Sequence, residues 1–284
     1  FNFNIPIDSE IEVKSEGLLG EKYEIDINHY CSNLYGTIDK RHPGIALVEK
    51  NGKYVISGKI GYYKTFNNVM ENIYLDPISS RNVMEQFKWV TVVGFHTRNI
   101  PHNGHLFIQK KAYQRINADG LFISPMIGTV KESDFKINEI VKCYNNLIDN
   151  NFYKEIEVLL NPIQYSPRFA GAREAIMTAL LRQNYGCSHF IVGRDHSGAG
   201  DYGQKTKSLN SIYDELKNDM DIKLIFFNEV YYSIRDKLIT DNPISDISDK
   251  MPISGTEVRK ILKEKKQFDY PILEKLVLDC LSDI

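Results

Sequence analysis

Short apolar runs alternate with helix-like segments over the last two thirds of the chain. The apolar runs, which are strand candidates, lie at 92–95, 120–127, 156–160, 189–192 and 222–227. Apolar residues recur at helical spacing in the segments 106–112, 137–147 and 172–184, and a capped helix is predicted from Ser254 or Thr256 into a helical tail over 260–284. Strands that alternate with helices predict a parallel α/β sheet, and ligands bind at the carboxyl ends of such strands.

The first third of the chain has a different pattern. The segment 44–60 predicts a β-hairpin, because Asn51-Gly52 is a strong turn signal between two apolar stretches. A helix capped by Ser79 or Ser80 is predicted over 78–90. We therefore expect a small β-rich N-terminal domain at 1–86, followed by an α/β domain at 87–284.

The first apolar run of the α/β domain leads into His96-Thr97-Arg98-Asn99-Ile100-Pro101-His102-Asn103-Gly104-His105. This order predicts strand, loop and helix, and a helix N-terminus offers unpaired N–H groups to a phosphate. His102 and His105 are three residues apart, so they share one face if the helix begins near them. Two imidazoles and Arg98 at one helix mouth suit a phosphoryl centre that gains charge in its transition state. A metal-binding role for the histidine pair lacks a closely spaced third ligand.

Composition narrows the classes of partner. The 284 residues carry a net charge of −2, which argues against a general nucleic-acid or membrane-surface binder, and no run approaches the ~20 apolar residues of a membrane span. The four cysteines lie far apart without a CxxC pair, so we expect no structural zinc. Free thiols indicate a reducing, cytoplasmic location.

The segment 96–105 resembles the signature of the ATP sulfurylases (sulfate adenylyltransferases), and its HxGH form is shared by a wider class of nucleotidyltransferases. Further stretches resemble the same family in the same order: 42–44, 58–60, 126–131, 170–175, 184–200 and 253–259. The resemblance implies a Rossmann-like nucleotidyltransferase domain preceded by a PUA-like domain. It also implies that sulfate attacks the α-phosphorus of ATP, giving adenylyl sulfate and pyrophosphate in sulfate assimilation.

The resemblance also assigns the site. It implies catalytic roles for Thr97, Arg98, Asn99, His102 and His105. It implies nucleotide contacts for these residues and for His96, Gly193, Arg194, Asp195, His196, Val230, Ser254, Gly255, Thr256 and Arg259. The acceptor anion would contact His96, Arg98, Arg194 and Ser197, and Mg²⁺ would accompany ATP through its phosphates. The Arg173-Glu174 pair is expected to be structural.

Three features depart from the family pattern. Residue 96 is His where the family has Gln, and Ser197 stands where it usually has Ala. Both positions belong to the expected acceptor pocket, where a hydrogen-bonding wall discriminates sharply between substrates. The cysteines that bind zinc in many relatives are missing near Tyr232-Ser233.

Three functions therefore stay open at this point: a sulfate adenylyltransferase, a nucleotidyltransferase with another small anionic acceptor (a phosphate ester, phosphonate or carboxylate), and a nucleotide-binding regulator without turnover. The sequence leaves the native acceptor, the base preference and the physiological direction undecided. Family members commonly form oligomers, so association into a homo-oligomer is also compatible with the sequence.

Overall fold

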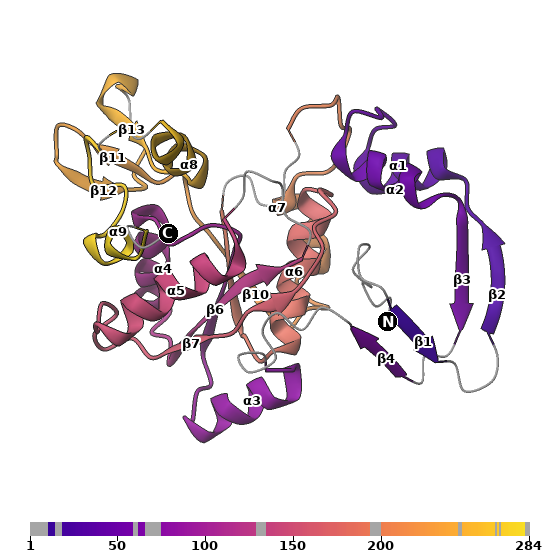
Figure 1. Cartoon of the computed structure of the whole chain (residues 1–284), viewed down its shortest axis with the longest axis horizontal. Helices are drawn as coiled ribbons and strands as arrows, with labels where there is room; N and C mark the ends of the chain where they lie inside the picture. The colour runs from indigo at the N-terminus through magenta and orange to yellow at the C-terminus, as the bar shows by residue number, and fades with distance from the viewer. Residues whose placement is uncertain are drawn as a thin grey trace. The chain divides into compact units, whose positions relative to one another are not determined.

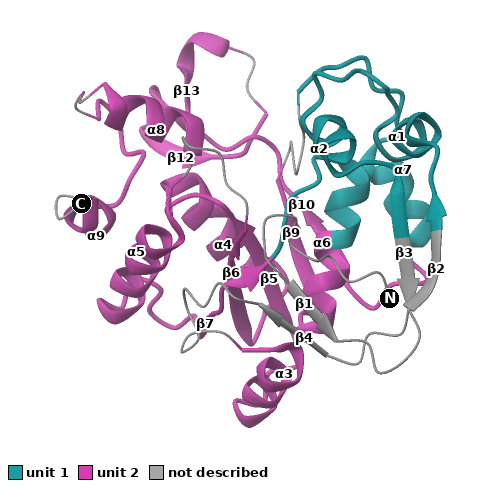
Figure 2. Cartoon of the chain, turned by 45° about the vertical axis from the view of Figure 1, so that its right-hand side comes forward, with its two compact units in different colours: residues 1–72, 165–177, 195–216 teal, residues 73–164, 178–194, 217–284 magenta. Residues whose placement is uncertain are grey.

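The computed structural model describes residues 11–14, 19–58, 62–65, 75–128, 135–193, 200–243, 246–264, 266 and 268–281. The chain divides into two compact units (Figure 2). Unit 1 contains 1–72, 165–177 and 195–216, and unit 2 contains 73–164, 178–194 and 217–284. Each unit draws on separate stretches of the chain, and the sequential domains 1–86 and 87–284 stay a prediction.

Unit 2 is built on a parallel sheet with the strand order β10-β9-β5-β6-β7, and β8 also pairs with β6. Figure 1 labels β6, β7 and β10 of this sheet, and Figure 2 also labels β5 and β9. The strands are β5 (Val92–Thr97), β6 (Gly120–Ile127), β7 (Val158–Leu160), β8 (Ile163–Gln164), β9 (His189–Val192) and β10 (Lys223–Phe226). Every pairing in this sheet is parallel, and β5 pairs with β6 from Val92↔Gly120 to Thr97↔Pro125. The predicted Rossmann-like α/β architecture is thus confirmed.

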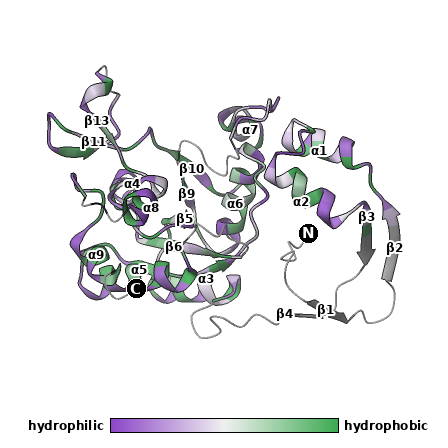
Figure 3. Ribbon diagram, turned by 45° about the horizontal axis from the view of Figure 1, so that its top comes forward, coloured by the Kyte–Doolittle hydropathy of each residue, from purple (hydrophilic) through white to green (hydrophobic). Residues whose placement is uncertain are grey.

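Helices cover both faces of this sheet. On one face, α4 (Asn103–Arg115) and α5 (Ile137–Asp149) bury their apolar residues in a cluster with Val93, Phe95, Leu121 and Ile123. The turns of α5 alternate hydrophobic and hydrophilic residues, as an amphipathic helix on a sheet requires (Figure 3). On the other face, the second half of α6 (Ala172–Asn184) and the segment after it contact the sheet through Arg182, Tyr185 and Cys187.

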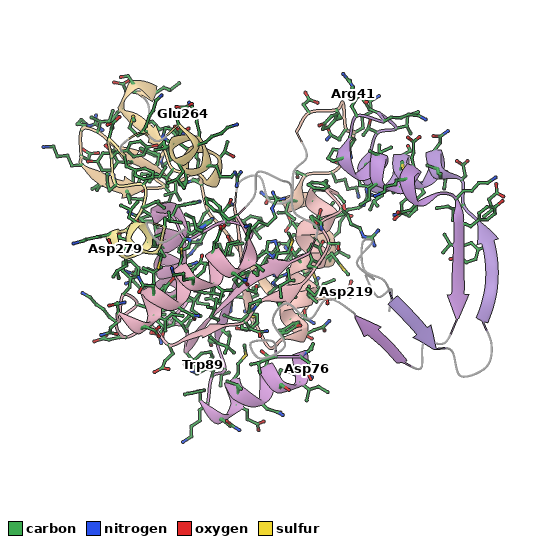
Figure 4. All side chains as sticks on the ribbon, viewed as in Figure 1. Arg41, Asp76, Trp89, Asp219, Glu264 and Asp279 are labelled. Carbon is green, nitrogen blue, oxygen red and sulfur yellow. The ribbon has the colours of Figure 1, made fainter. Side chains whose placement is uncertain are left out.

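The remaining helices of unit 2 are α3 (Pro77–Gln86), α8 (Gly255–Lys263) and α9 (Lys275–Leu281), with a 3₁₀ turn at Ile247–Asp249. The predicted cap of α3 is wrong: Asp76, labelled in Figure 4, accepts from Ser79 N at 2.8 Å, and Ser80 Oγ instead donates to Tyr185 O at 2.9 Å. Aspartate precedes Pro77 at the first helical turn, which is a favoured start. The predicted tail is helical only in part, since 268–274 separates α9 from α8.

A small antiparallel sheet with the order β12-β11-β13 completes unit 2, and the apolar pattern alone did not predict it. Its strands are β11 (Tyr231–Ser233), β12 (Leu238–Thr240) and β13 (Lys250–Pro252). The Asp249 carboxylate accepts from Arg235 N at 2.5 Å and from Ser233 Oγ at 2.7 Å. This carboxylate network ties β11 to the start of β13, in the region where the family resemblance leads us to look for zinc-binding cysteines.

Unit 1 contains two antiparallel strand pairs and three complete helices among its described residues. They are β1 (Ile11–Lys14) with β4 (Tyr62–Thr65), β2 (Leu19–Glu24) with β3 (Tyr54–Gly58), α1 (Ile27–Tyr35), α2 (Pro43–Asn51) and α7 (Leu209–Leu216). The first six residues of α6 also belong to this unit.

The predicted hairpin over 44–60 is wrong in its first half, because Pro43–Asn51 forms α2. His42 caps this helix by accepting from Gly44 N at 3.1 Å, and Pro43 occupies a favourable first helical position. Ile45 and Val48 then lie one turn apart against the buried cluster of unit 1. Gly52, with a φ of 80°, ends the helix, so the Asn-Gly pair marks a helix terminus and not a hairpin turn.

We predict that Asp249→Asn lowers the midpoint of urea unfolding at neutral pH. Hydrogen bonds from Arg235 N and then from Ser233 lower the pKa of Asp249 in the folded state. A depressed folded-state pKa stabilises the fold above the unfolded pKa of about 4, and this stabilisation is lost as the pH falls. The difference in unfolding midpoint between wild type and variant should therefore become smaller below about pH 4. Asp219→Asn, at the exposed position labelled in Figure 4, is the control and should match wild type throughout.

Candidate functional site

The loop between β5 and α4 brings two histidines to the N-terminus of α4. His102 is the N-cap, and its Nδ1 accepts a hydrogen bond from His105 N at 3.2 Å. The two rings stack with centroids 3.6 Å apart and 24° between their planes. This contact confirms the prediction that both imidazoles share one face at the helix start.

Burial keeps both imidazoles neutral. Burial lowers the pKa of His105 to about 3, against a small opposing effect of a backbone hydrogen bond at Ile100. The pKa of His102 is also well below 6.5, first through burial and then through the neighbouring His105 and the positive Arg259. Because Nδ1 of His102 accepts, its proton lies on Nε2, which is therefore a hydrogen-bond donor. Within the described residues, the buried Nδ1 of His105 has no hydrogen-bond partner.

The segment 254–259, to which the resemblance assigns nucleotide contacts, meets this same loop. Arg259 Nη1 donates to Asn99 Oδ1, and Arg259 Nη2 donates to Thr256 Oγ1 at 3.3 Å. Gly255 lies against the same amide: a Cβ at this position would be 2.4 Å from Asn99 Cγ. Ser254 caps α8 by accepting from Glu257 N at 3.2 Å. The N-terminus of α8 is thus fixed beside the loop that leads into α4.

Thr97 stabilises a tight turn in this loop. Its buried hydroxyl donates to Asn99 O at 3.0 Å and accepts from Asn99 N at 3.0 Å. A threonine hydroxyl carries one proton, so this turn uses its only donor. A donation from Thr97 to a phosphate of the nucleotide would require this turn to open. Asn99, by contrast, directs its oxygen to Arg259 and keeps its amide N–H groups on the other side.

The positive charge of the site comes from arginines and helix ends. The Arg98 side chain is half-buried, and no ion pair or hydrogen bond of its guanidinium is found within the described ranges. Arg259 supplies a second cation, and the N-termini of α4 and α8 add partial positive charges. Since the histidines are neutral, they contribute no charge, and His102 offers its Nε2–H as a donor.

The sequence did not point to Arg182, a fully buried arginine behind residue 96. Its Nη2 lies 2.6 Å from His96 Nδ1, and its Nε donates to Ser124 Oγ at 2.9 Å. Helical spacing could have indicated that Arg182 is buried. The buried residues Ala175, Thr178 and Ala179 of α6 place position 182 on the same helix face. A charged residue on an otherwise apolar helix face marks a specific polar contact.

The other expected site residues are described only in part. Gly193 directly follows β9, the neighbour of β5, and Val230 follows β10 and packs against the core of unit 2. Arg194, Asp195, His196 and Ser197 lie outside the described residues, as does Lys131 of the resembling loop at 126–131.

Glu174 of unit 1 is structural, as predicted. Its buried carboxylate accepts from Tyr165 OH at 2.8 Å, from Arg168 N at 3.0 Å and from Ala170 N at 2.9 Å. These bonds fix the loop that contains Phe169, whose φ of 61° is unusual for a large side chain. Arg173 donates to the carbonyls of Asn33 and Leu34, which anchors α6 to the end of α1.

No cluster of three or more His, Cys, Asp or Glu side chains in the described part of the chain can hold a metal ion. None of the described helices has the length and hydrophobicity needed to cross a membrane. All four cysteines are buried, and none of them forms a disulfide bond.

Comparisons with known proteins agree with the motifs. A family model described as ATP-sulfurylase matches residues 71–283. The chain is 37% identical over 249 residues to a sulfate adenylyltransferase of Trichormus variabilis, covering 86% of this chain and 62% of that protein. It is 36% identical over 251 residues to a sulfate adenylyltransferase of Pyrococcus abyssi, covering 87% of this chain and 65% of that protein. The chain thus spans less than two thirds of the length of these relatives.

A solved structure shares the fold. The structure titled "Hexameric APS kinase from Thiobacillus denitrificans" superimposes with a TM-score of 0.59 at 16% sequence identity, over 82% of this chain and 43% of that one.

We predict that His105→Gln makes the protein less sensitive to acid. In the unfolded chain this histidine binds a proton below about pH 6.5, whereas burial prevents this in the folded state. A depressed folded-state pKa stabilises the fold above pH 6.5, and the stabilisation is lost as the pH falls, by about 2 kcal/mol between pH 7 and 5. Urea unfolding at both pH values should show that the free energy of unfolding falls less in the variant than in wild type. His29→Gln, on an exposed residue of α1, should retain the wild-type loss; equal losses in all three proteins would contradict the prediction.

Proposed function

The chain belongs to the ATP-sulfurylase family, and from this premise we propose that it transfers the adenylyl group of ATP to sulfate. An oxygen of sulfate attacks the α-phosphorus, the bond from that phosphorus to the α–β bridging oxygen breaks, and pyrophosphate leaves with the electron pair. The products are adenylyl sulfate and pyrophosphate. Because an anion attacks a polyanion, the site must supply fixed cations and hydrogen-bond donors.

The observation that carries this proposal is the contact of Arg259 with Asn99. It joins the N-terminus of α8 to the loop that leads into α4, so Arg98, Arg259 and the two helix N-termini belong to adjoining segments. Asn99 is fixed with its amide N–H groups turned from Arg259, and His102 holds its proton on Nε2. These groups are all donors, as a triphosphate requires.

Each residue has a role in this proposal. Arg98 bridges the incoming oxyanion and the α-phosphate, and His102 and His105 steady the α- and β-phosphates. Asn99 orients the leaving group, and Thr97 shapes the loop that presents both neighbours. Gly193, the segment 194–196 and Val230 contact the nucleotide, while Ser254, Gly255, Thr256 and Arg259 form a second phosphate seat. His96, Arg98, Arg194 and Ser197 contact the acceptor.

Further parts of the proposal rest on the sequence and on the family resemblance. ATP brings Mg²⁺, which neutralises phosphate charge. The N-terminal region is a PUA-like domain, the protein works in a reducing cytoplasm, and it associates into homo-oligomers.

The test is pyrophosphate release from ATP with a panel of oxyanions and with no anion. We expect release that depends on sulfate. Release only with another anion would identify a different acceptor, and tight ATP binding without release would indicate a regulator; either result contradicts the proposal.

Arg98→Gln tests the residue that contacts both substrates. Loss of one preorganised charged donor at a transition state lowers kcat by about a hundredfold or more. Arg115→Gln, on an exposed position of the same helix α4, is the matched control and should retain wild-type kcat. A loss of less than about threefold in Arg98→Gln would remove Arg98 from the mechanism.

A further inference from the structure

Arg182 reaches residue 96 by lying along one face of the central sheet. Its aliphatic stem passes over Gly94: a Cβ at this glycine would be 3.2 Å from Arg182 Cγ and 3.1 Å from Cys187 Sγ. Its guanidinium lies 5.8 Å from the centre of the Phe190 ring. Gly94 therefore provides the space through which a long polar side chain crosses an apolar sheet face.

Three contacts fix the guanidinium. Nε donates to Ser124 Oγ at 2.9 Å, and this hydroxyl in turn donates to Phe95 O at 2.8 Å. Nη1 donates to Thr178 O at 3.4 Å, and Nη2 contacts His96 Nδ1 at 2.6 Å. Ser124 and His96 are paired neighbours on β6 and β5, so one arginine spans the end of both strands.

The chemistry of arginine then decides the state of His96. A guanidinium carries only N–H donors, so Nδ1 of His96 must accept. A neutral imidazole whose Nδ1 accepts carries its proton on Nε2. The side of the ring away from Arg182 is therefore a hydrogen-bond donor.

We propose that Arg182 is a positioning residue, which holds His96 in the Nε2–H tautomer so that residue 96 offers the acceptor an N–H donor. This inference rests on the proposed function, in which His96 contacts the acceptor. A glutamine at position 96 would behave in the same way, because its amide oxygen would accept from Arg182 and its NH₂ group would point away. Histidine thus preserves at this position the donor that the family glutamine supplies.

The substrate class follows from this polarity. A residue 96 that only donates suits a tetrahedral oxyanion without a proton, and sulfate at neutral pH is such an anion. Hydrogen phosphate carries an O–H group, which needs an acceptor and would face another donor at residue 96. Arg182 therefore favours fully ionised oxyanions over protonated ones.

The tautomer can be read directly by ¹⁵N NMR of the histidine rings at a pH near 8. The His96 signals are assigned by their loss in His96→Gln. We expect wild type to show the Nε2–H tautomer, and Arg182→Met to show a mixture. Arg182→Lys, which keeps a cationic donor, should restore the Nε2–H form. Ser124→Ala is the matched control, because it removes a partner of Arg182 and leaves the contact with His96.

Two results would overturn the inference: a wild-type His96 with its proton on Nδ1, or a folded Arg182→Met protein that keeps the pure Nε2–H tautomer. Where circular dichroism shows that Arg182→Met does not fold, Arg182→Gln replaces it. Its amide can donate or accept, so it should also release the tautomer preference.

Kinetics supply the second readout. In Arg182→Met the KM for sulfate should rise about tenfold, which corresponds to one lost hydrogen bond, while the KM for ATP stays unchanged. Inhibition by inorganic phosphate should strengthen relative to sulfate binding, since His96 can then accept. Equal rises in both KM values would indicate general damage and contradict the positioning role. If wild type releases no pyrophosphate with any anion, the proposed function fails, whereas the NMR result still decides the tautomer.

Discussion

A guanidinium can donate hydrogen bonds but cannot accept them, and the candidate site depends on this one-sided chemistry. Arg259 imposes an orientation on the amide of Asn99, and Arg182 imposes a tautomer on the ring of His96. Both partners can present either polarity when they are free. Each arginine occupies the accepting side, so that the opposite side of each group is a donor. Two residues that are ambiguous in isolation thereby become donors at the end of β5.

The candidate site is positively charged although its histidines stay neutral. Burial opposes the charging of His102 and His105, which removes the most pH-sensitive cations from the helix mouth. The remaining charge comes from arginine side chains, which stay protonated at any physiological pH, and from backbone dipoles. The donor geometry of the site is therefore set by packing and depends little on pH near neutrality.

The elements that the sequence predicted well are those whose periodicity matches their burial. The strands β5, β6 and β9 are buried and appear as apolar runs, β10 at the sheet edge buries its two central residues, and α5 has one apolar face. The hairpin over 44–60 failed because its Asn-Gly pair also suits a helix end, and the cap at His42 with Pro43 decided for the helix. The sheet of β11, β12 and β13 was missed because three-residue strands have too few residues to show a period.

The sequence by itself determined the family, the parallel sheet and the loop of the candidate site, because ordered motifs and apolar periodicity are properties of the chain alone. Only the tertiary structure decided which atoms of that site donate. Arg182 lies 86 residues from His96, and Arg259 lies 160 residues from Asn99. Hydrogen-bond polarity depends on what lies opposite a side chain in space, and no local pattern records a neighbour so distant along the chain.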